Sequence, residues 1–156
     1  MTTQRFRYVR IPATASEAFP DAAFYLRPLI PVTLTAGRKS ARLLALIDSG
    51  ADNTLFSLQV AAMLGLNLRK APADSFCGTS GHEQVARYRR LTVRVGTVGY
   101  PTLVGFAELP CDVAGILGQD GFFDRFTVTL DQARGLILLK HSRPLHRPAS
   151  PSPATR

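Results

Sequence analysis

Short segments of apolar residues, separated by clusters of turn-forming residues, make up most of the chain. Leu91, Val93 and Val95 alternate with polar neighbours, which is typical of a strand with one buried face. Other segments are rich in β-branched and aromatic residues and are bounded by glycine, proline or aspartate, as strands are. Strands are therefore expected at residues 31–35, 41–47, 75–77, about 91–95, 100–107, 126–130 and 136–140, with hairpins over 31–47 and 126–140.

One segment has the signals of a helix instead. Ser57 is a good N-terminal cap, the helix continues to about Leu64, and Gly65 suits the position after its last turn. A second helix is expected to start near Asp120. The chain is thus predicted to be mainly β with one or two short helices.

Three parts are distinguished along the chain. Residues 1–24 are polar and interrupted by prolines, so the segment 6–11 is either an isolated strand or part of a flexible arm. This N-terminal part is also a candidate pro-segment. Residues 25–141 contain the other predicted strands and are expected to form one folded domain. Residues 142–156 are rich in proline and arginine, bury too little apolar surface to fold, and are expected to be a disordered tail.

Composition is that of a single globular domain, with 156 residues of which 46% are hydrophobic. No apolar run approaches the ~20 residues of a membrane span, and the N-terminal residues do not read as a secretory signal. A cytoplasmic protein without a membrane partner is therefore expected. Cys77 and Cys111 provide no disulfide framework. The formal net charge of +8 comes from scattered basic residues without a nucleic-acid-binding motif, so nucleic acid is not an expected partner.

The expected strand 41–47 is apolar on both faces, which predicts a central position in the sheet, and it runs directly into Asp48-Ser49-Gly50-Ala51. This tetrapeptide fits the D-[ST]-G-[AS] signature of aspartic proteases. A carboxylate at the end of a buried strand is rigidly held, and glycine allows a tight turn and a close approach to a ligand. Alone, however, Asp-Ser-Gly is equally typical of an ordinary turn.

Two downstream segments favour the catalytic interpretation. Ile116, Leu117 and Gly118 are typical of a buried strand that passes behind a catalytic loop and ends where only glycine leaves room. Between the two motifs lies a glycine-rich hairpin tip, Gly78-Thr79-Ser80-Gly81, where a mobile lid over the acid is needed.

In this order, the segments RPLIPVTLTAGRKSARLLALIDSGADNTLF, FCGTSGHEQVARYRRLTVRVG and GILGQDGFF resemble the retropepsin-like (retroviral-type) aspartic proteases, over residues 27 to about 140. The helix and the last hairpin are more similar to cellular and bacterial members than to viral ones. The resemblance implies a closed β-barrel or sandwich that is active as a homodimer. It also implies an endopeptidase that acts on polypeptides and needs no metal or other cofactor.

The resemblance implies a role for each matching residue. Asp48 is the catalytic acid in a loop completed by Ser49, Gly50 and Ala51, and the Ser49 hydroxyl braces the two loops across the dimer. Asp52 and Asn53 line the substrate channel beneath a flap. The substrate-binding flap residues are Phe76, Cys77, Gly78, Thr79, Ser80 and Gly81, and structural support behind the loop comes from Ile116, Leu117 and Gly118.

One position departs from the family pattern. Viral members usually carry arginine directly after the Ile-Leu-Gly motif, paired with the acid that corresponds to Asp52, whereas this chain has Gln119. An amide has no charge with which to form that ion pair. A nearby cation or a different hydrogen bond is therefore expected to stabilise Asp52, or else the dimer interface has a different geometry.

The expectation of a homodimer follows from the chemistry. Two carboxylates act on one water, one accepting and the other donating a proton. The chain has one Asp-Ser-Gly, and Asp120 sits in a motif of the wrong order. The second carboxylate is therefore expected to be Asp48 of a second copy. Because two carboxyl groups this close cannot both ionise freely, the pair should titrate as one unit. The activity is therefore expected to depend on pH in a bell-shaped curve and to favour acidic conditions.

Other interpretations stay open at this point. A retropepsin-like dimer that binds proteins or peptides with little or no proteolysis fits the same motifs, and a basic nucleic-acid-binding module fits the charge alone. Cys77, Cys111 and His82 lack the paired spacing of a metal site, so no metal is expected. Ser49, His82 and Asp52 lack the nucleophile elbow of serine hydrolases.

Overall fold

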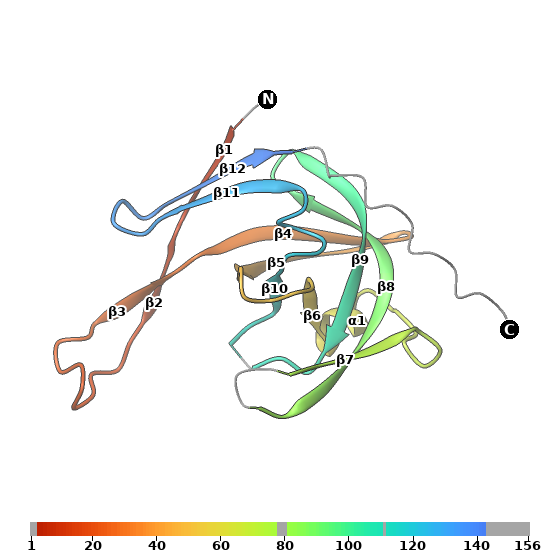
Figure 1. Cartoon of the computed structure of the whole chain (residues 1–156), viewed down its shortest axis with the longest axis horizontal. Coiled ribbons are helices and arrows are strands. Elements are labelled where there is room, and N and C mark those ends of the chain that lie inside the picture. Colours follow the sequence, from red (N-terminus) through yellow and green to blue (C-terminus); the bar gives the residue numbers. More distant parts are fainter. Residues whose placement is uncertain (1–2, 78–80, 111, 143–156) are drawn as a thin grey trace, which may run out of the picture.

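The computed structural model describes residues 3–77, 81–110 and 112–142, and this part of the chain forms twelve strands and one α-helix (Figure 1). The strands of the N-terminal half are β1 (Thr3–Arg7), β2 (Val9–Pro12), β3 (Phe24–Arg27), β4 (Leu29–Ala36), β5 (Lys39–Ile47) and β6 (Leu55–Ser57). The later elements are α1 (Leu58–Met63), β7 (Ala73–Cys77), β8 (Glu83–Val95), β9 (Val98–Ala107), β10 (Gly115–Leu117), β11 (Phe126–Asp131) and β12 (Leu136–His141). The expected mainly β class is confirmed.

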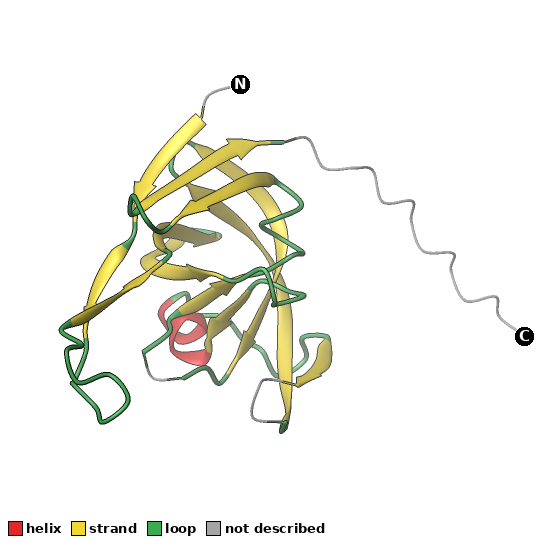
Figure 2. Ribbon diagram, turned by 60° about the vertical axis from the view of Figure 1, so that its left-hand side comes forward, coloured by secondary structure: helices red, strands yellow, loops and turns green. Residues whose placement is uncertain are grey.

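The largest sheet closes on itself. Its strands follow the order β4-β5-β10-β6-β9-β8-β7, and β4 pairs with β8 as well, from Val32 opposite Val95 to Thr35 opposite Thr92. Closure is possible because β8 is long enough to pair with β7 near its start and with β4 near its end. Only the last part of β8, near residues 91–95, was expected from the sequence. The closed barrel is visible in Figure 2.

The hairpins predicted over residues 31–47 and 126–140 are confirmed as β4–β5 and β11–β12. β5 lies between β4 and β10, which confirms its central position. Its outward face is less covered than the sequence indicated, because the Leu44 side chain is 45% exposed. Ile47, at the end of the strand, is buried. The end of β5 that leads into Asp48 is the part paired on both sides, with β4 and with β10.

The N-terminal strand pairs with a strand from the other end of the described chain. β1 pairs with β12, which also pairs with β11, in a three-stranded sheet that we call the terminal sheet. Phe6 packs against the main core, and its cross-strand neighbour Ile137 is fully buried. β2 pairs with β3 in a separate two-stranded ribbon. Residues 6–11 thus belong to two strands, β1 and β2, which are separated at Tyr8 and held by partners that local sequence does not reveal.

The predicted helix is present as α1. The Ser57 hydroxyl accepts a hydrogen bond from the Val60 amide at 3.4 Å, and Gly65 follows the helix with a φ of 65°. In Figure 2 the helix lies at the opposite end of the barrel from the terminal sheet. With six residues it is far too short for a bilayer, and no helix of the described residues is long and apolar enough to cross one.

The helix start expected near Asp120 is wrong. Residues 121–125 form consecutive turns, in which the Phe123 amide reaches back to the Gly118 carbonyl and the Phe126 amide to the Phe122 carbonyl. The turns bury the Phe122 and Phe126 rings, whose centroids lie 5.2 Å apart with planes tilted by 37°. Aromatic packing in the core, rather than continued helical hydrogen bonding, decides the conformation here.

Candidate active site

Asp48 directly follows β5, at a point where the backbone is held from two sides. Leu46 is paired with Leu29 of β4, and Ile47 is paired with Leu117 of β10. The Asp48 amide continues this ladder by donating to the Leu117 carbonyl at 3.1 Å. The carboxylate therefore starts from a fixed backbone position, and in the single chain it is half-buried.

The loop turns tightly around the carboxylate. The Gly50 amide donates to Asp48 Oδ1 at 2.9 Å, and the Ala51 amide donates to the Asp48 carbonyl at 3.3 Å. A Cβ on residue 50 would lie 3.3 Å from the same Oδ1, so glycine lets the amide approach without crowding. Asp48 Oδ2 has no hydrogen-bond partner among the described residues. One carboxylate oxygen is thus oriented by the protein, and the other is left for an external partner.

The segment 117–120 clamps the loop from behind. The Gln119 amide donates to the Ala51 carbonyl and the Asp120 amide to the Asp52 carbonyl, both at 2.8 Å. The Thr54 amide returns a bond to the Asp120 carbonyl at 3.0 Å. Successive residues of the two segments therefore hold each other in register, as a short parallel ladder does.

Gly118 is the closest point between the two segments. A Cβ at this position would lie 2.6 Å from the Asn53 carbonyl carbon and 2.7 Å from the Ala51 oxygen, both backbone atoms that cannot rotate away. Leu117, one residue earlier, is fully buried. Gly118 therefore lies against the backbone of the loop, and Ile116 and Leu117 lead into it from β10.

Two side chains complete the clamp, and one of them was missed. Thr54 is 1% exposed, and its hydroxyl accepts a hydrogen bond from the Gly118 amide at 3.1 Å. Gln119 donates from Nε2 to the Ser49 carbonyl oxygen at 2.7 Å. The sequence singled out Gln119 only as a departure from the family pattern. It carried no signal for Thr54, since a buried threonine looks like a surface one in a single sequence.

Asp52 has no ion pair with any cation of the described residues. Its side chain is exposed, and only its backbone joins the clamp. Gln119 does not replace the missing arginine at Asp52, because its amide is directed to Ser49 instead. The compensating cation considered in the sequence analysis is therefore absent from the described part of a single chain.

The residues that the sequence analysis expected in a flap lie in and after β7, which pairs with β8. Phe76 and Cys77 end β7 and pair with Gln84 and Glu83. Phe76 is half-buried against a small cluster that contains Leu55, the first residue of the strand after the loop 48–54. Gly78, Thr79 and Ser80 lie outside the described residues. Gly81, the first described residue after them, has a φ of 72°. The base of the hairpin thus packs beside the end of the loop 48–54.

Among the described residues, no three His, Cys, Asp or Glu side chains come together in a group that fits a metal ion. Cys77 is exposed, and Cys111 lies outside the described residues.

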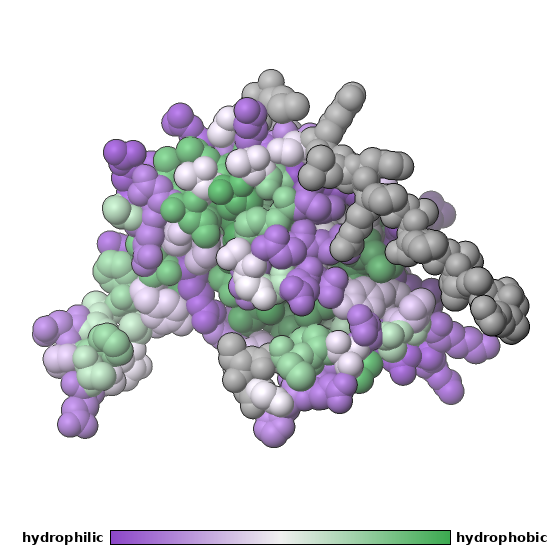
Figure 3. Space-filling model, viewed as in Figure 1, coloured by the Kyte–Doolittle hydropathy of each residue, from purple (hydrophilic) through white to green (hydrophobic). Residues whose placement is uncertain are grey.

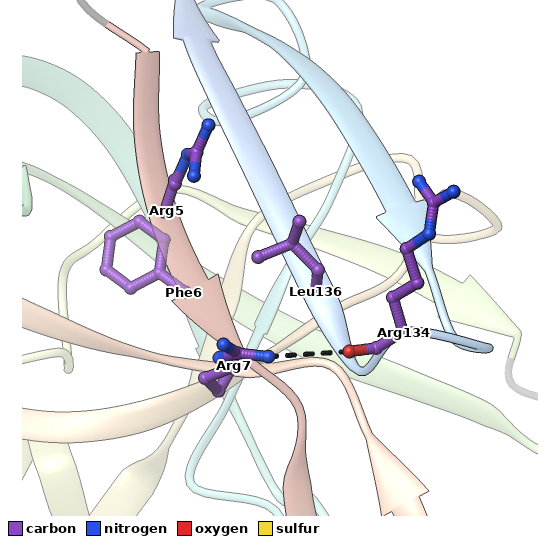
Figure 4. A pocket seen from close by; sticks show the side chains of 5 residues that line it. All are labelled: Arg5, Phe6, Arg7, Arg134 and Leu136. Atoms are coloured by element: carbon purple, nitrogen blue, oxygen red, sulfur yellow. Dashed lines mark hydrogen bonds between the residues drawn. The ribbon is translucent and has the colours of Figure 1, made fainter.

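A shallow hollow of about 310 Å³ lies on the terminal sheet, away from this loop (Figure 4). Its lining consists of Arg5, Phe6, Arg7, Arg134 and Leu136. Arg7 donates a long hydrogen bond of 3.5 Å to the Arg134 carbonyl across its lower edge. None of the lining residues belongs to the loop 48–54 or to the segment 117–120, so the hollow is separate from the candidate active site.

The chain is similar to known proteins in sequence and in fold. A family model described as aspartyl protease matches residues 30–120, more than half of the chain. No curated protein matches the chain. Among solved structures, a retropepsin-like aspartic protease from Rickettsia conorii is similar with a TM-score of 0.58 and 15% identity, over 89% of this chain and 99% of that one. EIAV protease complexed with the inhibitor HBY-793 is 22% identical over 60% of this chain and 82% of that one, with a TM-score of 0.49. The chain belongs to the aspartyl protease family and is an aspartic-type endopeptidase with a retropepsin-like fold.

Proposed function

We propose that the chain acts as a homodimer, in which Asp48 of each copy supplies one of two catalytic carboxylates that cut polypeptides. The observation that carries this proposal is the clamped loop, which holds one carboxylate, in a chain with one Asp-Ser-Gly-Ala motif. Hydrolysis by aspartic proteases uses two carboxyl groups that share a proton. A second copy related by a twofold axis brings an identical carboxylate with an identical clamp.

In the proposed mechanism one carboxyl group is ionised and the other is protonated. Two full negative charges about 3 Å apart repel by roughly 5 kcal/mol at an effective dielectric constant of about 20, so one proton stays in the pair. The carboxylate takes a proton from the water between the two groups. The water oxygen bonds to the scissile carbonyl carbon, while the other carboxyl donates its proton to the carbonyl oxygen. The group that took the proton of the water then donates it to the amide nitrogen, while the other, now ionised, takes a proton from one hydroxyl of the diol. The C–N bond breaks, and a carboxylic acid and an amine are released.

Each residue of the loop has a part in this proposal. The Gly50 amide on Asp48 Oδ1 fixes the direction of the carboxylate, and Oδ2 faces the water. Ser49 is exposed in the single chain, and its hydroxyl is proposed to brace the two loops across the twofold axis. Ala51, Asp52 and Asn53 follow on the same clamped segment and are proposed to line the substrate channel.

The flap is proposed to be the β7–β8 hairpin, with Phe76 and Cys77 at its base and residues 78–81 at its tip. Support comes from Phe76, which packs against the small cluster that contains Leu55, the first residue after the loop 48–54. A hairpin in this position closes over an extended peptide, hydrogen-bonds its backbone and excludes water.

The proposed function is tested with Asp48→Asn and a matched control, Asp120→Asn. The first variant is expected to lose cleavage of a peptide library by a factor of about 10⁴ or more, because both copies lose the acid. The second keeps activity, because only the backbone of Asp120 takes part in the clamp. Circular dichroism checks that both variants stay folded.

A tethered dimer tests whether cleavage needs one Asp48 carboxylate or two. Two copies are joined by a flexible linker, and Asp48→Asn is introduced into one of them. The proposal expects this half-substituted pair to be inactive, since one acid remains without its twin. Cleavage by the half-substituted pair would contradict the shared site. A wild-type chain that binds peptides and a pepstatin-type inhibitor without cleavage between about pH 3 and 7 would instead favour a binding module.

A further inference from the structure

The ribbon formed by β2, β3 and the connecting residues 13–23 projects from the barrel, and we call it the hairpin arm. Among the described residues, β2 and β3 pair only with each other, from Val9 opposite Arg27 to Pro12 opposite Phe24. The arm extends to the lower left in Figure 1, and in Figure 3 its tip stands clear of the rest of the described chain. A two-stranded hairpin is only marginally stable alone in water, so the arm is a candidate for a further contact.

The tip of the arm has a defined backbone but an exposed aromatic side chain. Ser16 and Phe19 exchange two backbone hydrogen bonds of 3.1 Å, and the Ala22 amide donates to the Phe19 carbonyl at 3.2 Å. Phe19 is nevertheless 70% exposed, more than any other large hydrophobic residue described. Because the backbone at Phe19 is already hydrogen-bonded, little backbone entropy is lost when the ring binds, which suits an interface anchor.

The rings along the arm support this assignment. Phe24 and Tyr25 are 43% and 42% exposed. The Arg10 guanidinium lies 4.0 Å from the centre of the Phe24 ring, and the Arg27 guanidinium lies 5.4 Å from that of Tyr25. These contacts hold the two rings in place on the ribbon. The arm therefore offers a preformed apolar surface rather than a loose loop.

Charge indicates the kind of partner. The connecting residues 13–23 contain two acids, Glu17 and Asp21, and no basic residue. Neither acid forms an ion pair within the described part of the chain. The whole chain carries a formal net charge of +8, so a second copy is a strongly basic partner for this acidic tip.

The base of the arm lies beside Asp48. Pro28 joins β3 to β4, and its carbonyl accepts a hydrogen bond from the Ile47 amide at 3.0 Å, one residue before the catalytic acid. Arg27 is also tied to Asp112 by an ion pair of 2.7 Å, in the loop that leads to β10. When two Asp48 residues face each other across a twofold axis, each arm therefore starts close to that axis and extends away from its own barrel.

We propose that the hairpin arm of each copy packs against the partner copy, with Phe19 as its apolar anchor and Glu17 and Asp21 against basic residues of the partner. The inference rests on the proposed homodimer and goes beyond it, because it names the segment that sets the strength of association. The arms lie outside the catalytic loops, so they govern how much enzyme is dimeric and not the chemistry of the assembled site.

The experiment compares Phe19→Ser with Met63→Ser, a control at a 64% exposed apolar residue on α1. Sedimentation equilibrium of the full chain measures the dimer dissociation constant. Phe19→Ser is expected to raise the dissociation constant about tenfold or more, because an aromatic anchor is lost. Met63→Ser is expected to change the constant by about twofold at most. Glu17→Lys combined with Asp21→Lys is expected to weaken association at about 50 mM salt and to lose most of this effect near 500 mM.

Activity of the tethered dimer keeps the two proposals apart. Phe19→Ser in both halves of a tethered pair is expected to leave cleavage unchanged, because the linker replaces the contribution of the arms to association. A wild-type dimer whose dissociation constant is the same with Phe19→Ser would overturn the role of the arm and leave the proposed function intact. A chain that cuts peptides while it stays single at every concentration would overturn both.

Discussion

Gln119 donates a hydrogen bond from its side-chain amide to the carbonyl oxygen of Ser49 at 2.7 Å. The bond joins the segment after β10 to the residue beside Asp48, in addition to the backbone bonds of the clamp. The family resemblance noted in the sequence led us to expect an arginine here, paired with Asp52, as viral members usually have. Here a neutral donor is used, and Asp52 has no ion pair among the described residues. The loop is thus positioned by an amide rather than by a charge.

Replacing Gln119 by leucine is expected to lower kcat by about threefold to tenfold with little change in KM, because ~1 kcal/mol of loop positioning is lost. Steady-state kinetics on one peptide substrate measure both constants. Gln59→Leu, an exposed glutamine on α1, is the control and keeps wild-type values. An unchanged kcat in Gln119→Leu would show that the backbone clamp alone positions the loop.

Gly118→Ala is expected to destabilise the fold by about 3 kcal/mol and to reduce activity, because the new Cβ pushes against the backbone of Asn53 and Ala51. Neither backbone atom can move without opening the clamp. Urea unfolding measures the free energy. Gly99→Ala is the matched control, since its Cβ meets only the mobile end of Arg94 at 3.5 Å. Equal stability of the two variants would contradict the close approach at Gly118.

Tyr100 links stability to alkaline pH. Its hydroxyl donates to the Gly121 carbonyl at 3.0 Å, and burial raises its pKa far above the ordinary value of 10.0, with a smaller contribution from Asp124. Because the pKa is raised in the folded state, the stabilisation is complete below about pH 10 and is lost as the pH rises above it. The free energy of unfolding is therefore expected to fall steeply above pH ~10.

Tyr100→Phe is expected to reduce the fall in the free energy of unfolding at alkaline pH. At neutral pH the variant is expected to be less stable by ~1 kcal/mol, because the hydrogen bond is lost. Some slope should remain, because burial also raises the pKa of Tyr8 and Tyr88. Unfolding curves at pH 7 and at successive values above 9 provide the measurement. If Tyr100→Phe loses stability at alkaline pH as steeply as the wild type does, Tyr100 is not the main cause of that loss.

Removal of residues 1–7 is expected to destabilise the folded domain by several kcal/mol, because β12 loses a partner strand and Phe6 no longer covers the core. Phe6→Ala alone is expected to lower the free energy of unfolding by about 2 kcal/mol. Thr3→Ala, at an exposed position of β1, is expected to leave it nearly unchanged. Thermal unfolding of the three variants measures these differences. Wild-type stability after the truncation would instead support a removable pro-segment.

Local patterns were sufficient for the elements that depend on near neighbours. Strand-like segments joined by turn-forming residues predicted the two hairpins over 31–47 and 126–140, and Ser57 with Gly65 predicted the limits of α1, because turns and caps are made by residues close in sequence. The apolar residues before Asp48 likewise predicted a central strand that ends in the acidic loop. Only the exposure of Leu44 departs from that pattern.

Contacts between distant segments were beyond the reach of such patterns. β10 has three residues, too few to show a period, and only the tertiary structure inserts it between β5 and β6. The same holds for the closure of β4 on β8 and for the pairing of β1 with β12. The sequence by itself determined which residue types stand at the candidate site. The tertiary structure decided that Gln119 reaches Ser49 and that Thr54 reaches Gly118, because a hydrogen bond depends on how atoms far apart in the chain meet in space.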